Sequence, residues 1–128
     1  MRYLAIALLA IGMAACTNDS TSPNGSVRGT YDLRTVNGSD LPVLVQGGCS
    51  LSNDQLTISS DGSYHEDFIY SNCSPNADEG TYSVTNNVVD FFSDFGNTFT
   101  GSVSGNVLTI QIPSQFTGTS DVWVYSRE

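Results

Sequence analysis

Alternation of apolar and polar side chains is the dominant pattern of the chain from Val27 onward. Short runs rich in β-branched and aromatic residues are separated by Asn, Gly and Asp, as is typical of strands joined by turns. No stretch keeps the i, i+3, i+4 apolar spacing of an amphipathic helix over three turns. We expect strands near residues 27–36, 42–48, 53–59, 63–72, 80–85, 88–95, 98–104, 107–112 and 121–127.

The residues between the later strands indicate tight hairpin turns. The pairs with this character are Asp61-Gly62, Asn86-Asn87, Gly96-Asn97 and Gly105-Asn106. Asn, Asp and Gly tolerate the positive φ that such turns require, so neighbouring strands should pair as a meander. A long meander removes its exposed edges by closing. The sequence therefore predicts an all-β fold, a small closed antiparallel up-and-down barrel of about eight strands, with a β-sandwich as the alternative.

The alternation also predicts which side chains face the interior. The expected inward sets are Tyr82/Val84, Val89/Phe91, Phe99/Val103 and Leu108/Ile110/Ile112. In the last strand, Trp123 and Tyr125 lie opposite Val122 and Val124, and the pattern leaves both choices open. Most of the inward side chains are large, and an eight-stranded barrel is just wide enough to be filled by side chains or to hold one small ligand. We therefore expect a filled or shallow interior.

The turn at Asp61-Gly62 sets the register of the strands that flank it. A two-residue turn would place Ile58 opposite His65, which mixes apolar and polar side chains on one face. A three-residue turn over 60–62, with its glycine in the left-handed region, places Ile58 opposite Tyr64 instead. The side chains that then share this face are Leu56, Phe68 and Tyr70. Because only the second register keeps the apolar face consistent, it is the one we expect.

Residues 1–15 have the layout of a secretory signal. Arg2 is followed by an apolar run that is too short to span a bilayer, and small residues precede Cys16. The sequence Met13-Ala14-Ala15-Cys16 resembles a bacterial lipobox, with Met13 where leucine is usual. The resemblance implies that the chain is cleaved before Cys16 and that this cysteine carries acyl chains such as palmitate, enough for stable membrane anchoring. An ordinary cleaved signal with a stray cysteine is the alternative.

Three segments of the chain follow from this reading. Residues 1–15 are the expected lipoprotein signal peptide, residues 16–26 the lipidated cysteine with a polar tether, and residues 27–128 one folded domain. Thr17, rather than aspartate, follows the cysteine. By resemblance to the sorting rule of enteric bacteria, this favours the outer membrane. The expected location is the bacterial cell envelope.

Cys49 and Cys73 would stand opposite each other if the expected ladder ran far enough, because they fit the same register as Ile58 and Tyr64. In an exported protein a disulfide would persist there. The loop of about 25 residues would contribute about 3 kcal/mol. Two free thiols are the alternative. A metal site with His65 is disfavoured, since no CxxC or HxxxH spacing is present.

The net charge of the chain limits the kinds of partner that it can bind. The chain has 13 acidic and four basic residues, and loss of Arg2 with the signal takes the formal net charge from −9 to −10. Such a surface repels nucleic acid and anionic lipid, so no nucleic-acid partner is expected. Solubility accounts for the acidity more simply than an acidic binding role does.

The sequence offers little catalytic chemistry. His65, the one histidine, precedes Glu66 and Asp67 on an expected strand, where neighbours point to opposite faces. His65 and Glu66 therefore cannot converge on one substrate atom. Glu66 falls on the apolar face, which indicates a position near the barrel rim, with a ligand-binding carboxylate as the alternative. We expect no enzyme, no cofactor and no metal site.

Most of the folded domain resembles the short lipocalin-like domains of bacterial lipoproteins. The segments that carry the resemblance are GTYDLRTVNGSDLP (29–42), LTISSDGSYHED (56–67), GTYSVTNNVVDFF (80–92) and FTGSVSGNVLTI (99–110). The chain departs from the family in having Tyr31 where a tryptophan is usual, and it has no mid-barrel Thr-Asp-Tyr motif. The resemblance implies that Arg127, near the end of the last strand, covers the ring of Tyr31. The run LRTVNG (33–38) also resembles the start of META-type domains.

Two functions fit these observations. The first is a non-catalytic, membrane-anchored envelope lipoprotein whose filled barrel serves a structural or interaction role. The alternative is binding or carriage of a small hydrophobic ligand in the barrel mouth, for which a connected apolar cavity of about 300 Å³ would be needed. The expected partners are the membrane, through the lipid anchor, and such a ligand. Nothing in the sequence indicates an oligomeric state.

Overall fold

The computed structural model describes residues 27–113 and 120–128, and this part of the chain is almost entirely strand. Its one helical element is a 3-10 turn, η2 (Gln46–Gly48). The strands are β1 (Gly29–Val36), β2 (Ser39–Asp40), β3 (Val43–Leu44), β4 (Ser50–Ile58), β5 (Ser63–Tyr70), β6 (Asn76–Thr85), β7 (Val88–Ser93), β8 (Thr98–Ser104), β9 (Val107–Pro113) and β10 (Ser120–Arg127).

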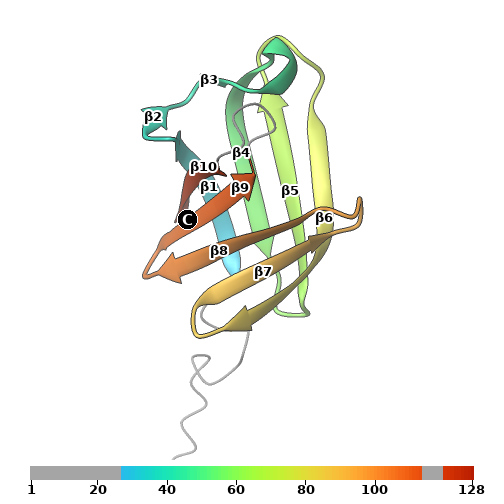
Figure 1. The fold of residues 1–128 in the computed structure, drawn as a ribbon, viewed down its shortest axis with the longest axis vertical. Helices are drawn as coiled ribbons and strands as arrows, with labels where there is room; N and C mark the ends of the chain where they lie inside the picture. The colour runs from blue at the N-terminus through green and yellow to red at the C-terminus, as the bar shows by residue number, and fades with distance from the viewer. Residues whose placement is uncertain (1–26, 114–119) are drawn as a thin grey trace, which may run out of the picture.

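Eight of these strands form a closed antiparallel barrel (Figure 1). From β4 to β10 each strand pairs with the next along the chain, and β1 pairs with β10 on one side and with β4 on the other. Gly29 is the partner of Ile58, and Tyr31 is the partner of Arg127. The pairing of β1 with β4 closes the sheet, so the predicted barrel is confirmed and the sandwich alternative is excluded.

The barrel has two distinct ends. At the cap end β1 begins beside the last residues of β4 and β10, near Gly29, Ile58 and Arg127. At the opposite end, which we call the mouth, β4, β6, β8 and β10 begin and β1, β5, β7 and β9 finish. The short strands β2 and β3 extend the sheet beyond the barrel on the mouth side of β1 and β4, as Figure 1 shows.

Most hairpin turns lie where the sequence places them. Asn86 and Asn87 both have positive φ, at 50° and 67°, and join β6 to β7. The turn at 60–62 has three residues, with Gly62 at φ 92°, and gives the predicted pairing of Ile58 with Tyr64. The turn predicted at Gly96-Asn97 is wrong by one position. Asn97 accepts a hydrogen bond from the Ser93 amide at 2.8 Å, so the loop is 94–96 and only its glycine has positive φ.

The strand predicted over 42–48 is the main error in the element boundaries. Only Val43 and Leu44 pair with β4, and the chain then enters η2. Gly47 and Gly48 have φ of 79° and 74°, so the backbone turns where a strand would have to stay extended. Two other strands are longer than predicted, since β4 begins at 50 and β6 begins at 76.

The core is built from the inward sets of alternating residues. Val89, Phe91, Leu108 and Ile110 are fully buried. In β10 the face that carries Tyr125 and Trp123 points inward. Tyr125 is fully buried, and Trp123 packs against the same core. Remaining members are Val27, Tyr31, Leu33, Leu51, Leu56, Ile58, Tyr64, Tyr82 and Val103.

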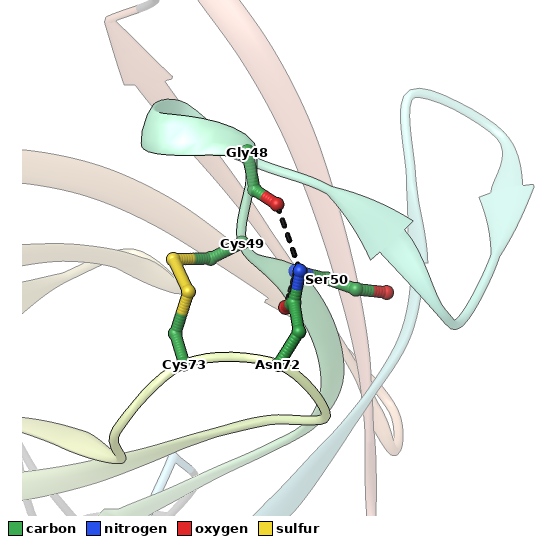
Figure 2. The surroundings of a disulfide bond; sticks show 5 residues. All are labelled: Gly48, Cys49, Ser50, Asn72 and Cys73. Atoms are coloured by element: carbon green, nitrogen blue, oxygen red, sulfur yellow. Dashed lines mark hydrogen bonds between the residues drawn. A yellow bond between two sulfur atoms is a disulfide. The ribbon is translucent and has the colours of Figure 1, made fainter.

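The predicted disulfide joins Cys49 to Cys73, with their Cα atoms 5.7 Å apart (Figure 2). The ladder does not run as far as the cysteines, because the register shifts between Leu51 and Asn53. Instead the Asn72 side chain lies beside the bridge. It accepts a hydrogen bond from the Ser50 amide at 2.6 Å and donates one to the Gly48 carbonyl at 3.0 Å. The disulfide and the asparagine together hold the segments that precede β4 and follow β5.

Candidate functional site

A cavity of about 310 Å³ opens at the mouth of the barrel. Its walls come from β5, β6, β8 and β9, and the lining side chains are Glu66, Phe68, Asp78, Asn97, Thr98, Phe99, Ile112 and Pro113. Ligand pockets in proteins have volumes of about 300–1,000 Å³. The cavity therefore has room for one small molecule. We call it the cup.

A cluster of aromatic side chains packs inside the barrel, and one of its members, Phe99, also lines the cup. The rings of Phe91 and Phe99 are stacked, with centroids 4.7 Å apart, and the Tyr64 ring meets both edge-on at 5.2 and 5.9 Å. Edge-to-face and offset-stacked pairs are the favoured arrangements of aromatic side chains. Tyr64 and Phe91 are buried, so this part of the barrel interior is filled by side chains.

A second hollow of about 350 Å³ adjoins the cup on its outer side. It shares Phe68, Asp78 and Asn97 with the cup and adds Phe95, from the loop between β7 and β8. The Phe95 side chain is 74% exposed, which places a large apolar group in water at this lip of the mouth.

Two acidic side chains are buried together beside the cup. Asp54 on β4 is fully buried and Glu66 on β5 is 4% exposed. The hydroxyl oxygen of Tyr125, on β10, lies 2.9 Å from Asp54 Oδ2 and 2.7 Å from Glu66 Oε1. A tyrosine hydroxyl has one proton to donate. One of these two contacts must therefore be donated by a carboxyl group, so the pair holds at least one proton.

Burial sets the protonation of this cluster. It raises the pKa of Asp54, and the charge and hydrogen bond of Glu66 raise it further. Burial also raises the pKa of Glu66, against the lowering effect of hydrogen bonds from Asp54 and Tyr125. For the same reason, and because both carboxyls face it, the pKa of Tyr125 lies well above its usual value. Burial therefore favours the protonated form of both carboxyl groups, in agreement with the proton that the hydrogen bonds to Tyr125 require.

Asp78 contributes a third carboxylate to the cup. Its two oxygens accept hydrogen bonds from the Tyr64 hydroxyl, at 2.9 Å, and the Ser93 hydroxyl, at 2.5 Å. Asp78 and Glu66 are partners across the β5–β6 ladder and both line the cup. Burial and the hydrogen bond to Asp78 raise the pKa of Tyr64, which keeps that hydroxyl a donor. The hydroxyls hold the Asp78 carboxylate in a fixed orientation.

The sequence predicts the face of the strand on which Glu66 lies, but it did not identify Asp54 as a site residue. Glu66 lies on the apolar face as predicted, and it lines the cup at the mouth of the barrel although its side chain is only 4% exposed. Asp54 pairs with Phe68 in the register that the 60–62 turn imposes, and it alternates inward with Leu56 and Ile58. That register was available from the sequence, so the signal existed. Asp54 was not identified because an aspartate near the beginning of a predicted strand is usually a turn residue rather than part of the apolar face.

The polar run after Tyr64 divides between the two faces of β5. His65 and Asp67 lie on the outer face, with His65 Nε2 2.9 Å from Asp67 Oδ1, while Glu66 points inward. The Nδ1 atom of His65 also lies 3.6 Å from Glu79 Oε2. His65 and Glu66 do not converge on one point. Within residues 27–113 and 120–128, no three His, Cys, Asp or Glu side chains are arranged to hold a metal ion.

The contact expected at the cap end is present. The Arg127 guanidinium carbon lies 5.1 Å from the centre of the Tyr31 ring, and the two residues are partners in the β1–β10 ladder. The Tyr31 hydroxyl donates to the Val27 carbonyl at 2.7 Å. An aromatic ring under a guanidinium and a short segment before β1 thus close the end of the barrel opposite the cup.

No family model matches this chain, and no curated protein is similar to it. The expected signal peptide, Cys16 and the tether lie outside the described residues. Within the described ranges, no helix has the length and apolar character needed to cross a membrane.

Proposed function

We propose that this domain is a binding module of the bacterial cell envelope that holds one small ligand in the mouth of its barrel. The cup carries the proposal, because it is an open cavity of ligand-binding size with apolar walls from Phe68, Phe99 and Ile112. Cavities that combine apolar walls with a few polar groups are the usual form of small-molecule sites.

The cellular location of the module is proposed from the first residues of the chain. Met13-Ala14-Ala15-Cys16 and the polar segment after it support a lipoprotein anchored through Cys16, in the outer membrane by resemblance. The barrel, and the contact of Arg127 with Tyr31, agree with the lipocalin-like plan that the sequence resembles. We therefore propose a lipocalin-like lipoprotein without catalytic activity.

Binding of the fluorescent apolar probe N-phenyl-1-naphthylamine tests the ligand site. The probe should bind the chain with a rise in emission, and Ile112→Trp, which fills the cup, should remove most of that rise. Val107→Trp places the same side chain at a position that is 43% exposed and serves as the control. Equal probe binding by the Ile112→Trp and Val107→Trp variants would place the probe elsewhere and contradict the proposal.

A structural or interaction role with a filled barrel is the second candidate. The observation that favours it is the packing below the cup, where Tyr64, Phe91 and Tyr31 leave the barrel filled toward the cap end. Absence of probe binding, together with no small molecule extracted from the purified protein by organic solvent and detected by mass spectrometry, would favour this candidate.

A further inference from the structure

The exposed side chain of Phe95 is carried by a well-fixed turn. The Phe95 amide donates a hydrogen bond to Ser93 Oγ at 3.1 Å, and the Gly96 amide donates to the Ser93 carbonyl at 2.9 Å. The Asp94 amide donates to the Glu79 carbonyl at 2.8 Å. A turn held in this way presents its side chain at a defined place before any ligand arrives, which lowers the entropic cost of binding there.

Phe95 lines the hollow of about 350 Å³ beside the cup, which we call the outer hollow. Phe68, Asp78 and Asn97 line both cavities, so the cup and the outer hollow meet at these three side chains, the junction. The apolar side chains on either side of the junction are Phe99 and Ile112 in the cup and Ala77 and Phe95 in the outer hollow. One molecule that lies in the cup and extends across the junction therefore reaches Phe95.

The junction carries two polar groups with different hydrogen-bonding capacity. The oxygens of Asp78 accept one hydrogen bond each, from the hydroxyls of Tyr64 and Ser93. An ionised carboxylate has about four acceptor sites, so each oxygen can accept a further bond. The side-chain amide of Asn97 brings N–H donors to the same place. An acceptor and a donor that line the same two cavities match the N–H and C=O groups of one amide.

Charge and wall chemistry exclude the other classes of ligand. An anion would be repelled by Asp78 and by the net charge of −9. Burial favours the protonated form of Glu66, so this side chain supplies no charge for a cation in the cup. A peptide would bring further backbone amides to apolar walls that give them no partner. A neutral molecule with one amide between two apolar groups satisfies the junction and both cavities.

We propose that the cup and the outer hollow together bind a neutral secondary amide that joins two apolar groups, with its N–H on Asp78, its carbonyl on Asn97 and its outer apolar group against Phe95. This proposal rests on the proposed binding function and specifies its ligand class. It makes Phe95 a specificity-determining residue, because a ligand with a single apolar group fills the cup and does not reach the outer hollow.

Uncharged probes test the ligand class by equilibrium dialysis against the full chain at pH 7. N-benzylbenzamide should bind about tenfold more tightly than its ester analogue benzyl benzoate, which has no N–H for Asp78. It should bind about fivefold more tightly than N-benzylacetamide, which has only one ring and leaves Phe95 without a contact. A blocked dipeptide with two rings, N-acetyl-diphenylalanine amide, should bind more weakly than N-benzylbenzamide. These comparisons use the unaltered protein and do not depend on any variant folding correctly.

Two pairs of variants locate the contacts. Phe95→Ala should lower the affinity for N-benzylbenzamide about fivefold and leave that for N-benzylacetamide within about twofold. Phe92→Ala removes a ring that is 46% exposed on the outer face of β7, and as the control it should change neither affinity. Asp78→Asn replaces the charged acceptor by a weaker neutral one and should reduce the preference for the amide over the ester. Glu79→Gln, at the exposed neighbouring position, should retain that preference.

The outcomes separate the two proposals. Equal affinity of the amide and the ester for the unaltered protein would overturn the recognition of an amide, and equal losses in Phe95→Ala and Phe92→Ala would overturn the role of Phe95. Tighter binding of the blocked dipeptide than of N-benzylbenzamide would identify a peptide as the ligand and overturn the proposal as well. In each case, binding of N-phenyl-1-naphthylamine in the cup would leave the binding function intact. If neither the amides nor that probe binds, the binding function itself is wrong.

Discussion

At the scale of single residues, the carboxyl pair links the stability of the barrel to pH. The pKa of Asp54 and of Glu66 is raised in the folded state, chiefly by burial, so the folded chain holds protons that the unfolded chain releases. The unfolded value for such groups is about 4. The stabilising effect of the raised pKa is therefore complete below about pH 4 and declines as pH rises above it.

The free energy of unfolding should fall as pH rises from 4.5 to 7.5, with a slope of up to about 1.4 kcal/mol per pH unit for each proton released on unfolding. The titratable groups that interact with the pair are Tyr70, Tyr125 and Asp78, with a smaller electrostatic effect from Asp67 on the outer face. Urea unfolding at several pH values measures the slope. Asp54→Asn should make it shallower, and Asp90→Asn on the outer face should leave it unchanged. A slope that is the same in all three proteins would contradict the linkage.

The contact of Arg127 with Tyr31 can be measured directly. A double-mutant cycle of Arg127→Ala and Tyr31→Leu should give a coupling of about 0.5–2 kcal/mol in the free energy of unfolding, from the cation–π attraction and the cover that the arginine stem provides. Tyr31→Phe retains the ring and should retain the coupling. A coupling indistinguishable from zero would mean that the arginine only lies over the ring without stabilising it.

At the scale of elements, the disulfide fixes the mouth ends of β4 and β5. The cysteines are 24 residues apart, so replacing both by serine should cost about 3 kcal/mol of unfolding free energy by the loop-entropy estimate. Chemical denaturation of Cys49→Ser/Cys73→Ser against the oxidised protein measures this cost. Alkylation of both cysteines in the native protein without reductant would contradict the pairing.

The close approach of β6 and β7 at Gly80 leaves no room for a side chain. A Cβ atom there would lie 2.0 Å from the backbone oxygen of Phe92, so the strands would have to separate. Gly80→Ala should therefore destabilise the barrel by about 2–3 kcal/mol. Gly105→Ala, at a turn with φ 59° and open space around it, should cost only about 1 kcal/mol and is the control. Thermal unfolding of both variants would compare the two costs, and equal costs would rule out the clash.

The elements differ in how far the sequence alone predicts them. The 60–62 turn and its register follow from local chemistry, because one glycine and one consistent apolar face determine the pairing. The region 42–48 reads as a strand from its apolar residues, but Gly47 and Gly48 turn the chain, and which φ a glycine adopts depends on the rest of the fold. The predicted position of the turn near Gly96 was wrong for a similar reason, since Asn97 is equally suited to a turn and to a strand end.

The cup could not be predicted from the alternation of apolar and polar residues alone. Inward-facing residues were predicted strand by strand, but the height of each along the barrel axis follows from the stagger of all eight strands. That stagger brings Phe99 and Ile112 to the mouth beside Glu66, while Phe91 and Leu108 lie deeper in the barrel. The tyrosine between Asp54 and Glu66 comes from β10, whose inward face the pattern left open.

At the scale of the whole molecule, the proposed anchor would determine where the barrel works. If Cys16 is acylated, the protein should be found with membranes after cell fractionation, and Cys16→Ser should release it, because the remaining acidic surface has no attraction for anionic lipid. Immunoblots of the pellet and supernatant measure this distribution. Retention of the serine variant in the pellet after a high-salt wash would contradict anchoring through the cysteine.

The entry of the chain at the cap end determines how an anchored barrel would stand. β1 begins beside Ile58 and Arg127, and the cup opens at the other end of the same strands. If Cys16 is acylated, the anchor would join the folded domain at its cap end, so the cup would open at the end of the barrel away from the attachment. A ligand would then reach the cup without passing the point of attachment.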